Sequence, residues 1–89
     1  MTGLSRRLKE LNPKIKCIGV DPAGSVLAGP AHHKKGEKWV VEGTGKDFMP
    51  RVWDINSVDR FVEGPDKDSF LMARRLLKEE GLMVGGSSG

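Results

Sequence analysis

The sequence predicts an α/β domain with mostly parallel strands, and three observations support that fold class. Two segments carry apolar residues at the spacing of an amphipathic helix. Short runs of β-branched residues lie between them and are bounded by glycine and proline. The order along the chain is helix, strand, irregular region, strand, helix, strand and the start of a helix. Three expected strands make an incomplete sheet, because so few strands cannot easily bury two faces.

The first predicted helix spans residues 2–11, where leucines recur at i, i+4 and i+7. We expect Thr2 or Gly3 to cap its start. Pro13 should end it, because a residue before proline disfavours helical backbone. Residues 14–20 (KIKCIGV) turn continuously apolar in their second half, which predicts a strand buried there on both faces, as in a parallel sheet.

The middle of the chain is predicted to be mostly irregular, because residues 21–38 are rich in glycine, proline and polar side chains. A short extended run is expected at 39–41 and a glycine turn at 42–47. Residues 51–56 form either a short helix or a packed loop. Residues 58–63 (VDRFVE) are predicted to be a strand from their length and β-branched content.

The strongest periodic signal lies in residues 66–80, which predict an amphipathic helix with a charged outer face. Asp66 is expected at its N-cap and Gly81 just after its last turn. The apolar run 82–84 predicts the next buried strand. The closing sequence 85–89 (GGSSG) then reads as a turn placed to open another helix.

Composition excludes several classes of protein. Eighty-nine residues make one domain at most. Fifteen lysines and arginines against twelve acids give a net charge of +3, and the charges are mixed, unlike the basic patch of a nucleic-acid binder. The single Cys17 rules out an internal disulfide and fits a reducing compartment. We expect neither a membrane span nor a secretory signal, and therefore a cytoplasmic protein.

Two glycine turns are candidate binding elements. The turn at 85–89 follows a predicted strand, where open α/β sheets bind ligands, although composition alone allows a flexible tail equally well. Gly43 and Gly45 flank Thr44 and would let the backbone approach a substrate closely, although an ordinary turn has the same composition.

The other reactive side chains point to structural roles. Adjacent histidines, His32 and His33, stand beside two lysines, so we expect a solvated loop and no metal site. Cys17 lies in an apolar run, which favours a buried and inert thiol.

Several of these stretches recur together in one family. The chain resembles the cystathionine β-synthase branch of the fold type II pyridoxal-phosphate-dependent enzymes, which also include cysteine synthase. The resemblance is carried in order by Ile18-Gly19-Val20-Asp21-Pro22 with Gly24-Ser25, by residues 41–50 (VEGTGKDFMP), by Val58-Asp59-Arg60-Phe61, by residues 69–82, and by Gly85-Gly86-Ser87.

The resemblance implies roles for both glycine turns. Ser87, with Gly86 and Gly85, would bind the cofactor pyridoxal 5'-phosphate, with the Ser87 hydroxyl hydrogen-bonded to the pyridine nitrogen. A neutral partner does not hold that nitrogen protonated, which suits β-elimination and replacement. Gly43 and Gly45 would line the substrate side.

The resemblance also has gaps at particular positions. Lys46 stands where some members carry tyrosine, which leaves its role open. Thr2 and Gly3 match only the tail of the family's phosphate loop. No lysine here has the surroundings of the family's Schiff-base lysine, so we expect no catalytic residue on this chain.

The resemblance therefore implies a part of a three-layer catalytic large domain, residues 1–89, truncated at both ends. Alone it should be inactive and is not expected to bind the cofactor. The longer enzyme would be a homo-oligomeric lyase of transsulfuration and cysteine biosynthesis, condensing L-serine or an activated serine with L-homocysteine to cystathionine. Two alternatives stay open, namely a cysteine synthase that accepts sulfide and a stand-alone small binding module without catalysis.

Overall fold

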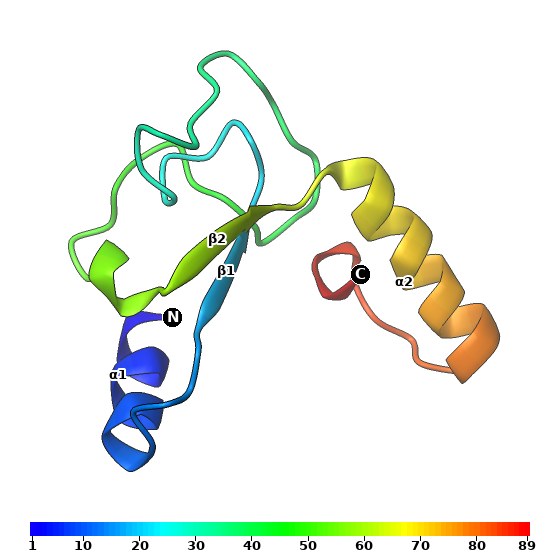
Figure 1. Ribbon diagram of the computed structural model, residues 1–89. Coiled ribbons are helices and arrows are strands. Elements are labelled where there is room, and N and C mark those ends of the chain that lie inside the picture. The colour runs from blue at the N-terminus through cyan, green and yellow to red at the C-terminus, as the bar shows by residue number, and fades with distance from the viewer.

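Two short parallel strands form the only sheet in the computed structural model, which describes residues 1–89 (Figure 1). Strand β1 (Ile18–Asp21) pairs with β2 (Arg60–Glu63), so that Ile18 lies opposite Arg60 and Asp21 opposite Glu63. The remaining elements are α1 (Thr2–Leu11), the 3-10 helix η1 (Ile55–Ser57), α2 (Asp66–Glu80) and the 3-10 helix η2 (Gly86–Ser88). The α/β class and the parallel pairing are thus as the sequence predicts.

Helix α1 has the predicted bounds, but it is neither capped nor packed as its sequence suggests. Its N-cap is Met1, and no side chain caps it. The expected Thr2 or Gly3 cap is wrong because the Thr2 hydroxyl is engaged elsewhere, as the acceptor of the Asp54 N–H at 3.1 Å. The helix buries Ser5, whose hydroxyl donates to the Ser57 carbonyl, while most of its leucine stripe faces outward.

Strand β1 is shorter than predicted and is buried on one face only. Gly19 and Asp21 are buried, whereas Ile18 and Val20 are exposed, Val20 by 67%. The Phe61 ring covers Gly19 so closely that a Cβ there would lie 2.7 Å from it. The prediction of burial on both faces is therefore wrong, because within this chain only that face is covered.

The predicted third strand, residues 82–84, is not a strand. The Leu82 N–H bonds back to the Leu76 carbonyl at 3.1 Å and closes the end of α2, and Met83 is 87% exposed. A strand requires a partner edge. This segment instead runs beside α2, away from β1 and β2, and so meets no such edge (Figure 1).

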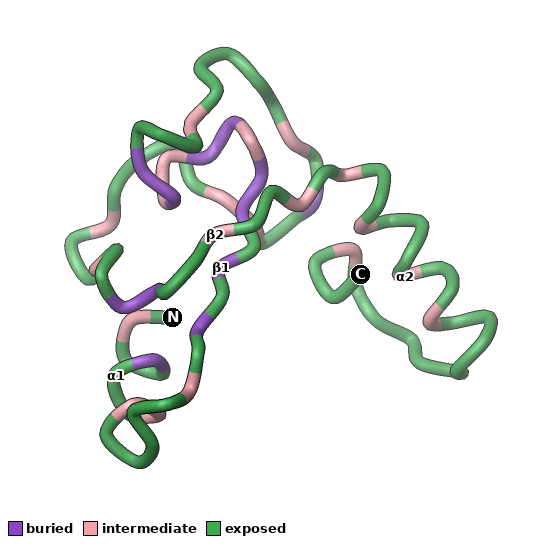
Figure 2. The backbone as a smooth tube through the Cα atoms, viewed as in Figure 1, coloured by how far each residue is buried: buried purple, intermediate pink, exposed green.

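Helix α2 begins and ends close to the predicted residues. Gly81 adopts φ 68°, the left-handed conformation that glycine tolerates, and its N–H bonds the carbonyls of Leu76 and Leu77. Asp66 is the first helical residue and not the cap, a position held by Pro65. The N-cap prediction for Asp66 is wrong because its carboxylate bonds a distant backbone segment. No residue of α2 is buried (Figure 2).

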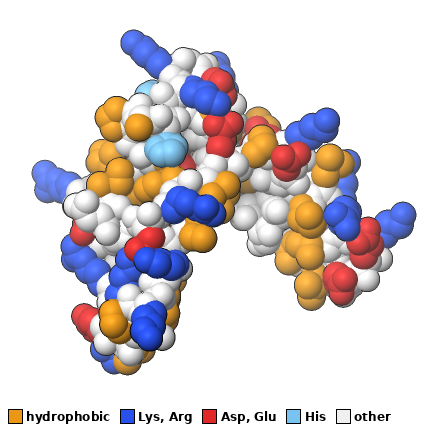
Figure 3. All heavy atoms as spheres, viewed as in Figure 1, with side chains coloured by type: hydrophobic (Ala, Val, Ile, Leu, Met, Phe, Trp, Pro, Cys, Tyr) orange, Lys and Arg blue, Asp and Glu red, His pale blue; other side chains and the backbone are white.

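The buried apolar residues lie around the sheet and the irregular segment that covers it, as Figure 2 shows. They are Cys17, Ala28, Val41 and Val58. The predicted burial of Cys17 is thus confirmed. Next to them the Trp53 and Phe61 rings meet edge to face at 6.2 Å. Apolar side chains also appear on the visible surface of the α2 region (Figure 3), which fits the absence of burial there.

A carboxylate, Asp59, ties α1 to the start of the sheet. The Lys9 ammonium lies 2.8 Å from it, and the Cys17 N–H donates to it at 2.7 Å. The hydrogen bond from Lys9, followed by that from Cys17, holds the pKa of the Asp59 carboxyl below its usual range. A lowered folded pKa contributes stability that is present above the unfolded value and lost as the pH falls through the folded pKa.

We expect the chain to lose part of its free energy of unfolding below about pH 4 through Asp59. The Asp59→Asn variant should be less stable at pH 7, and its stability should fall less between pH 7 and pH 3. Urea unfolding followed by circular dichroism at the two pH values measures both. Asp47→Asn, at an exposed loop carboxyl, is the control. An equal fall in wild type and Asp59→Asn would contradict the expectation.

Candidate functional site

A cavity of about 330 Å³ lies where both strands end. It brings together Asp21 at the end of β1, Glu63 at the end of β2, the first turn of α2, Thr44 and Ser87. Ligands of open α/β sheets bind outside the carboxyl ends of the strands. The two glycine turns chosen from the sequence, 40 or more residues apart, therefore contribute to the walls of a single cavity.

The turn at the end of the chain is packed against α2. A Cβ on Gly86 would lie 2.7 Å from the Phe70 ring, so only glycine permits this approach. Ser87 and Ser88 line the cavity, and neither hydroxyl has a hydrogen-bond partner within the protein. Gly85 and Gly86 support the turn without lining the cavity. The ordered packing favours the ligand-facing interpretation over that of a free tail.

The second turn is held in a conformation that requires glycine. Gly43 and Gly45 have φ of 82° and 65°, and the residue between them, Thr44, reaches the cavity wall. The Trp39 indole donates to the Thr44 carbonyl at 2.8 Å, and the Thr44 hydroxyl donates to the Val41 carbonyl at 2.9 Å. Sequence reasoning selected the two glycines and missed Thr44, although it is the one hydroxyl side chain between them.

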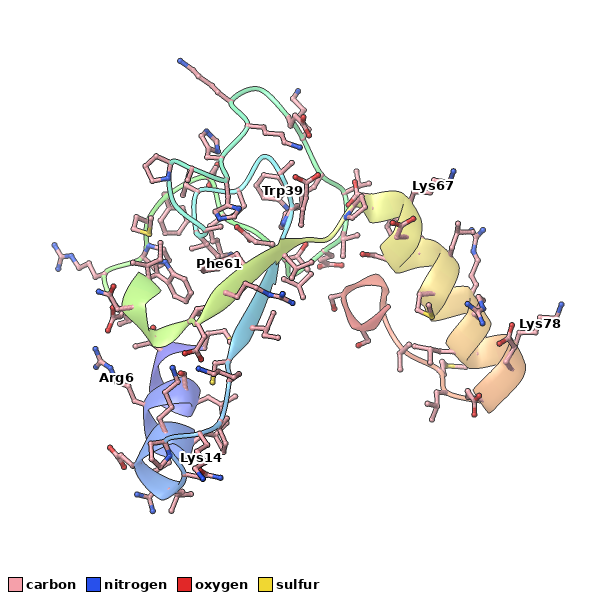
Figure 4. The ribbon with its side chains drawn as sticks, viewed as in Figure 1. Arg6, Lys14, Trp39, Phe61, Lys67 and Lys78 are labelled. Carbon is pink, nitrogen blue, oxygen red and sulfur yellow. The ribbon has the colours of Figure 1, made fainter.

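Ser25 anchors the far end of this turn. Its side chain, with 1% of the residue exposed, accepts the Lys46 N–H at 3.0 Å and the Leu27 N–H at 3.2 Å. The Val26 N–H donates in turn to the Lys46 carbonyl at 2.9 Å. The backbone of Lys46 is thus bonded on both sides while its side chain is exposed. Figure 4 shows Trp39 in this irregular region and Phe61 on β2.

The cavity is acidic. Asp21, Glu63 and Asp68 line it, and no lysine or arginine does. Asp21 is 6% exposed, and burial raises the pKa of its carboxyl, partly offset by hydrogen bonds from Ser25 and from the Ala28 N–H. The labelled Lys67 and Lys78 point outward from α2 (Figure 4). Lys34, outside the lining, lies 2.8 Å from the Glu63 carboxylate and pairs with its charge. The cavity lining itself offers no lysine or arginine to bind an anionic phosphate.

Two other sets of predicted residues lie outside this cavity. Thr2 and Gly3 line a separate open hollow of about 600 Å³ at the start of α1, together with Arg6 and Lys46. Nδ1 of His33 lies 3.1 Å from the Ser25 carbonyl, and His32 is exposed. The structure assembles no three histidine, cysteine or acidic side chains that could hold a metal ion.

None of the helices combines the length and apolar character needed to cross a bilayer.

Comparison with known proteins gives consistent matches. The family model for pyridoxal-phosphate dependent enzymes matches residues 1–89. Cystathionine beta-synthase of Dictyostelium discoideum is 48% identical over 100% of this chain and 18% of that protein. A putative cysteine synthase of Sinorhizobium fredii is 40% identical, over 100% of this chain and 26% of that protein. The crystal structure of an O-acetylserine dependent cystathionine beta-synthase from Helicobacter pylori superposes with a TM-score of 0.81 at 38% identity, over 98% of this chain and 27% of that one. The chain thus spans about a fifth to a quarter of these relatives.

Proposed function

Since the chain belongs to the family of pyridoxal-phosphate dependent enzymes, we propose that it forms part of the catalytic domain of a β-replacement enzyme that makes cystathionine. Its α/β fold with a parallel sheet is that of the fold type II members of this family. The observation that carries the proposal is the cavity at the strand ends, which the Ser87 turn and the Thr44 turn line together.

The cavity fits one part of the cofactor and not another. The Ser87 hydroxyl lines it without a protein partner, so it is available to a pyridine nitrogen. No lysine or arginine lines the cavity to bind the phosphate group, and three carboxyl side chains do line it. We therefore assign the nitrogen side of the ring to Ser87, supported by Gly85 and Gly86. The phosphate would lie elsewhere.

Pyridoxal phosphate, when bound, supplies an electron sink for chemistry at the α-carbon of an amino acid. The Ser87 hydroxyl would donate a hydrogen bond to the ring nitrogen and, as a neutral group, would leave that nitrogen unprotonated. The Gly43–Gly45 turn would orient the substrate, because Thr44 lines the cavity and the backbone N–H groups of Gly43 and Gly45 donate to no acceptor within the protein. These donors suit the carboxylate of an amino-acid substrate.

Homocysteine is the acceptor that we propose, with L-serine or an activated serine as donor. The 48% identity to a cystathionine beta-synthase supports this choice. Sulfide is the alternative, supported by the 40% identity to a putative cysteine synthase.

The assay that distinguishes homocysteine from sulfide as acceptor uses a full-length enzyme carrying this sequence, with serine or O-acetylserine as donor. We expect cystathionine to form with homocysteine, and faster than cysteine forms with sulfide. Reactions without donor or without acceptor are the controls. If the enzyme uses sulfide and does not use homocysteine, the proposal is wrong and cysteine synthase is the function supported.

We further propose that residues 1–89 are a partial large domain, truncated at both ends. Without a Schiff-base lysine they should catalyse no turnover alone. The longer protein would be a cytoplasmic, homo-oligomeric lyase of transsulfuration, acting on small amino acids. The share of each relative that the chain covers supports the proposal that residues 1–89 are part of a larger domain.

A further inference from the structure

One carboxylate, that of Asp66, accepts two hydrogen bonds from a distant stretch of backbone. Its Oδ2 lies 2.8 Å from the Val40 nitrogen, and its Oδ1 lies 3.1 Å from the Val41 nitrogen, 25 residues earlier in the sequence. Each carboxylate oxygen therefore accepts one hydrogen bond, and the two donors are consecutive backbone N–H groups. Hydrogen bonds to a charged acceptor are about twice as strong as neutral ones, so this contact fixes residues 40 and 41 against the start of α2.

From Val41 the contact continues to the cavity wall. Val41 is 3% exposed, and its carbonyl accepts the Thr44 hydroxyl at 2.9 Å. The Trp39 indole bonds the Thr44 carbonyl at 2.8 Å. Thr44 is thus held from both sides by the segment that Asp66 anchors, and it lines the cavity.

The opposite wall depends on the same end of α2. Asp68 and Ser69, in the first turn after Asp66, line the cavity directly. One residue further, the Phe70 ring packs against Gly86 and supports the turn that carries Ser87. The start of α2 is therefore a common frame for the Ser87 wall and, through Asp66, for the Thr44 wall.

We propose that Asp66 is a positioning residue that sets the Gly43–Gly45 turn at a fixed distance from Ser87. It touches neither cofactor nor substrate, and it acts through Val41 and Thr44. This inference rests on the proposed function, which assigns the substrate to that turn. An acid that merely offset the helix dipole would need no bonds to Val40 and Val41.

The test compares Asp66→Asn with wild type in the full-length enzyme carrying this sequence. The isosteric amide keeps one acceptor and turns an N–H₂ group toward the second backbone N–H. Asp66→Glu keeps both acceptor oxygens, one methylene further out. Glu80→Gln removes a charge from the exposed far end of α2 and is the matched control.

Two measurements are made on each variant. Amide hydrogen exchange in peptides covering residues 39–46 should speed up roughly tenfold in Asp66→Asn, a change of about 1.4 kcal/mol, because a bond to a charged acceptor is lost. KM for the amino-acid substrate should rise roughly tenfold while cofactor content stays at the wild-type level. In both measurements Asp66→Glu should give values between those of wild type and Asp66→Asn. Glu80→Gln should match wild type.

Unchanged exchange in residues 39–46, or lower thermal stability and cofactor content with an unchanged KM, would overturn the role of Asp66. If Asp66→Asn does not fold, the same comparisons are made with Asp66→Glu, which should show smaller shifts in the same direction. An enzyme that forms no cystathionine would refute the proposed function, and the exchange measurement would still decide the role of Asp66.

Discussion

Replacing Gly45 with alanine should lower kcat/KM of the full-length enzyme by roughly a hundredfold or more. Gly45 has φ 65°, a conformation that costs an L-residue about 1–2 kcal/mol. Its new Cβ would also lie 2.7 Å from the Trp39 ring and 2.8 Å from Pro22. The ring cannot move without breaking its bond to the Thr44 carbonyl. The turn must therefore shift, and Thr44 would leave the cavity wall.

A matched control separates the steric overlap of the new Cβ with Trp39 and Pro22 from the strain of a positive φ. Gly36 has φ 90°, and a Cβ there would meet nothing within 4 Å. Gly36→Ala should therefore lower the thermal stability slightly and leave kcat/KM unchanged. Steady-state kinetics on both variants measures the difference. Equal kcat/KM in Gly45→Ala and wild type would show that the turn does not contact substrate.

Ser87→Ala is expected to lower kcat of the full-length enzyme roughly ten- to a hundredfold while cofactor content changes little. The reason is that the variant removes a single hydrogen bond and leaves the ring nitrogen without a partner, which costs about 1–3 kcal/mol. On the proposed function the phosphate would be held outside this cavity, which no lysine or arginine lines, and it should still retain the cofactor. Cofactor absorbance and steady-state turnover, measured on the same samples, give both quantities.

The conservative variant Ser87→Thr retains a hydroxyl and should recover most of the lost turnover. Loss of cofactor with unchanged turnover per occupied site would assign Ser87 to retention of the cofactor. If Ser87→Thr is as slow as Ser87→Ala, the turn tolerates no change of shape. The lost hydrogen bond would then not explain the lower turnover.

The sequence predicts the helices well because their signals are local. The leucine spacing and Pro13 define α1, and Gly81 ends α2 through its own backbone conformation. The segment 82–84 has the composition of a strand and is not one, because a strand depends on a partner that a local pattern does not reveal.

In the candidate site, too, the local motifs are predictable from the sequence and the contacts between distant residues are not. The Ser87 turn and the Gly43–Gly45 turn are recognisable from short motifs, and the structure brings both to one cavity. Asp66 and Thr44 were not predicted as site residues. The Asp66 carboxylate has the local context of a helix cap, and only the fold brings Val40 and Val41 to it. Interactions between residues 25 apart have no signature in a single sequence.

The parallel pairing of β1 with β2 also has a consequence for the order of folding. The contact between Cys17 and Asp59 that opens the ladder joins residues 42 apart in the chain. Closing so long a loop is slow compared with forming a helix, although each doubling of its length costs only about 0.6 kcal/mol. The helices should therefore form first and the sheet late. The cavity at the strand ends should then be among the last features to assemble, because it requires the paired strands as well as α2.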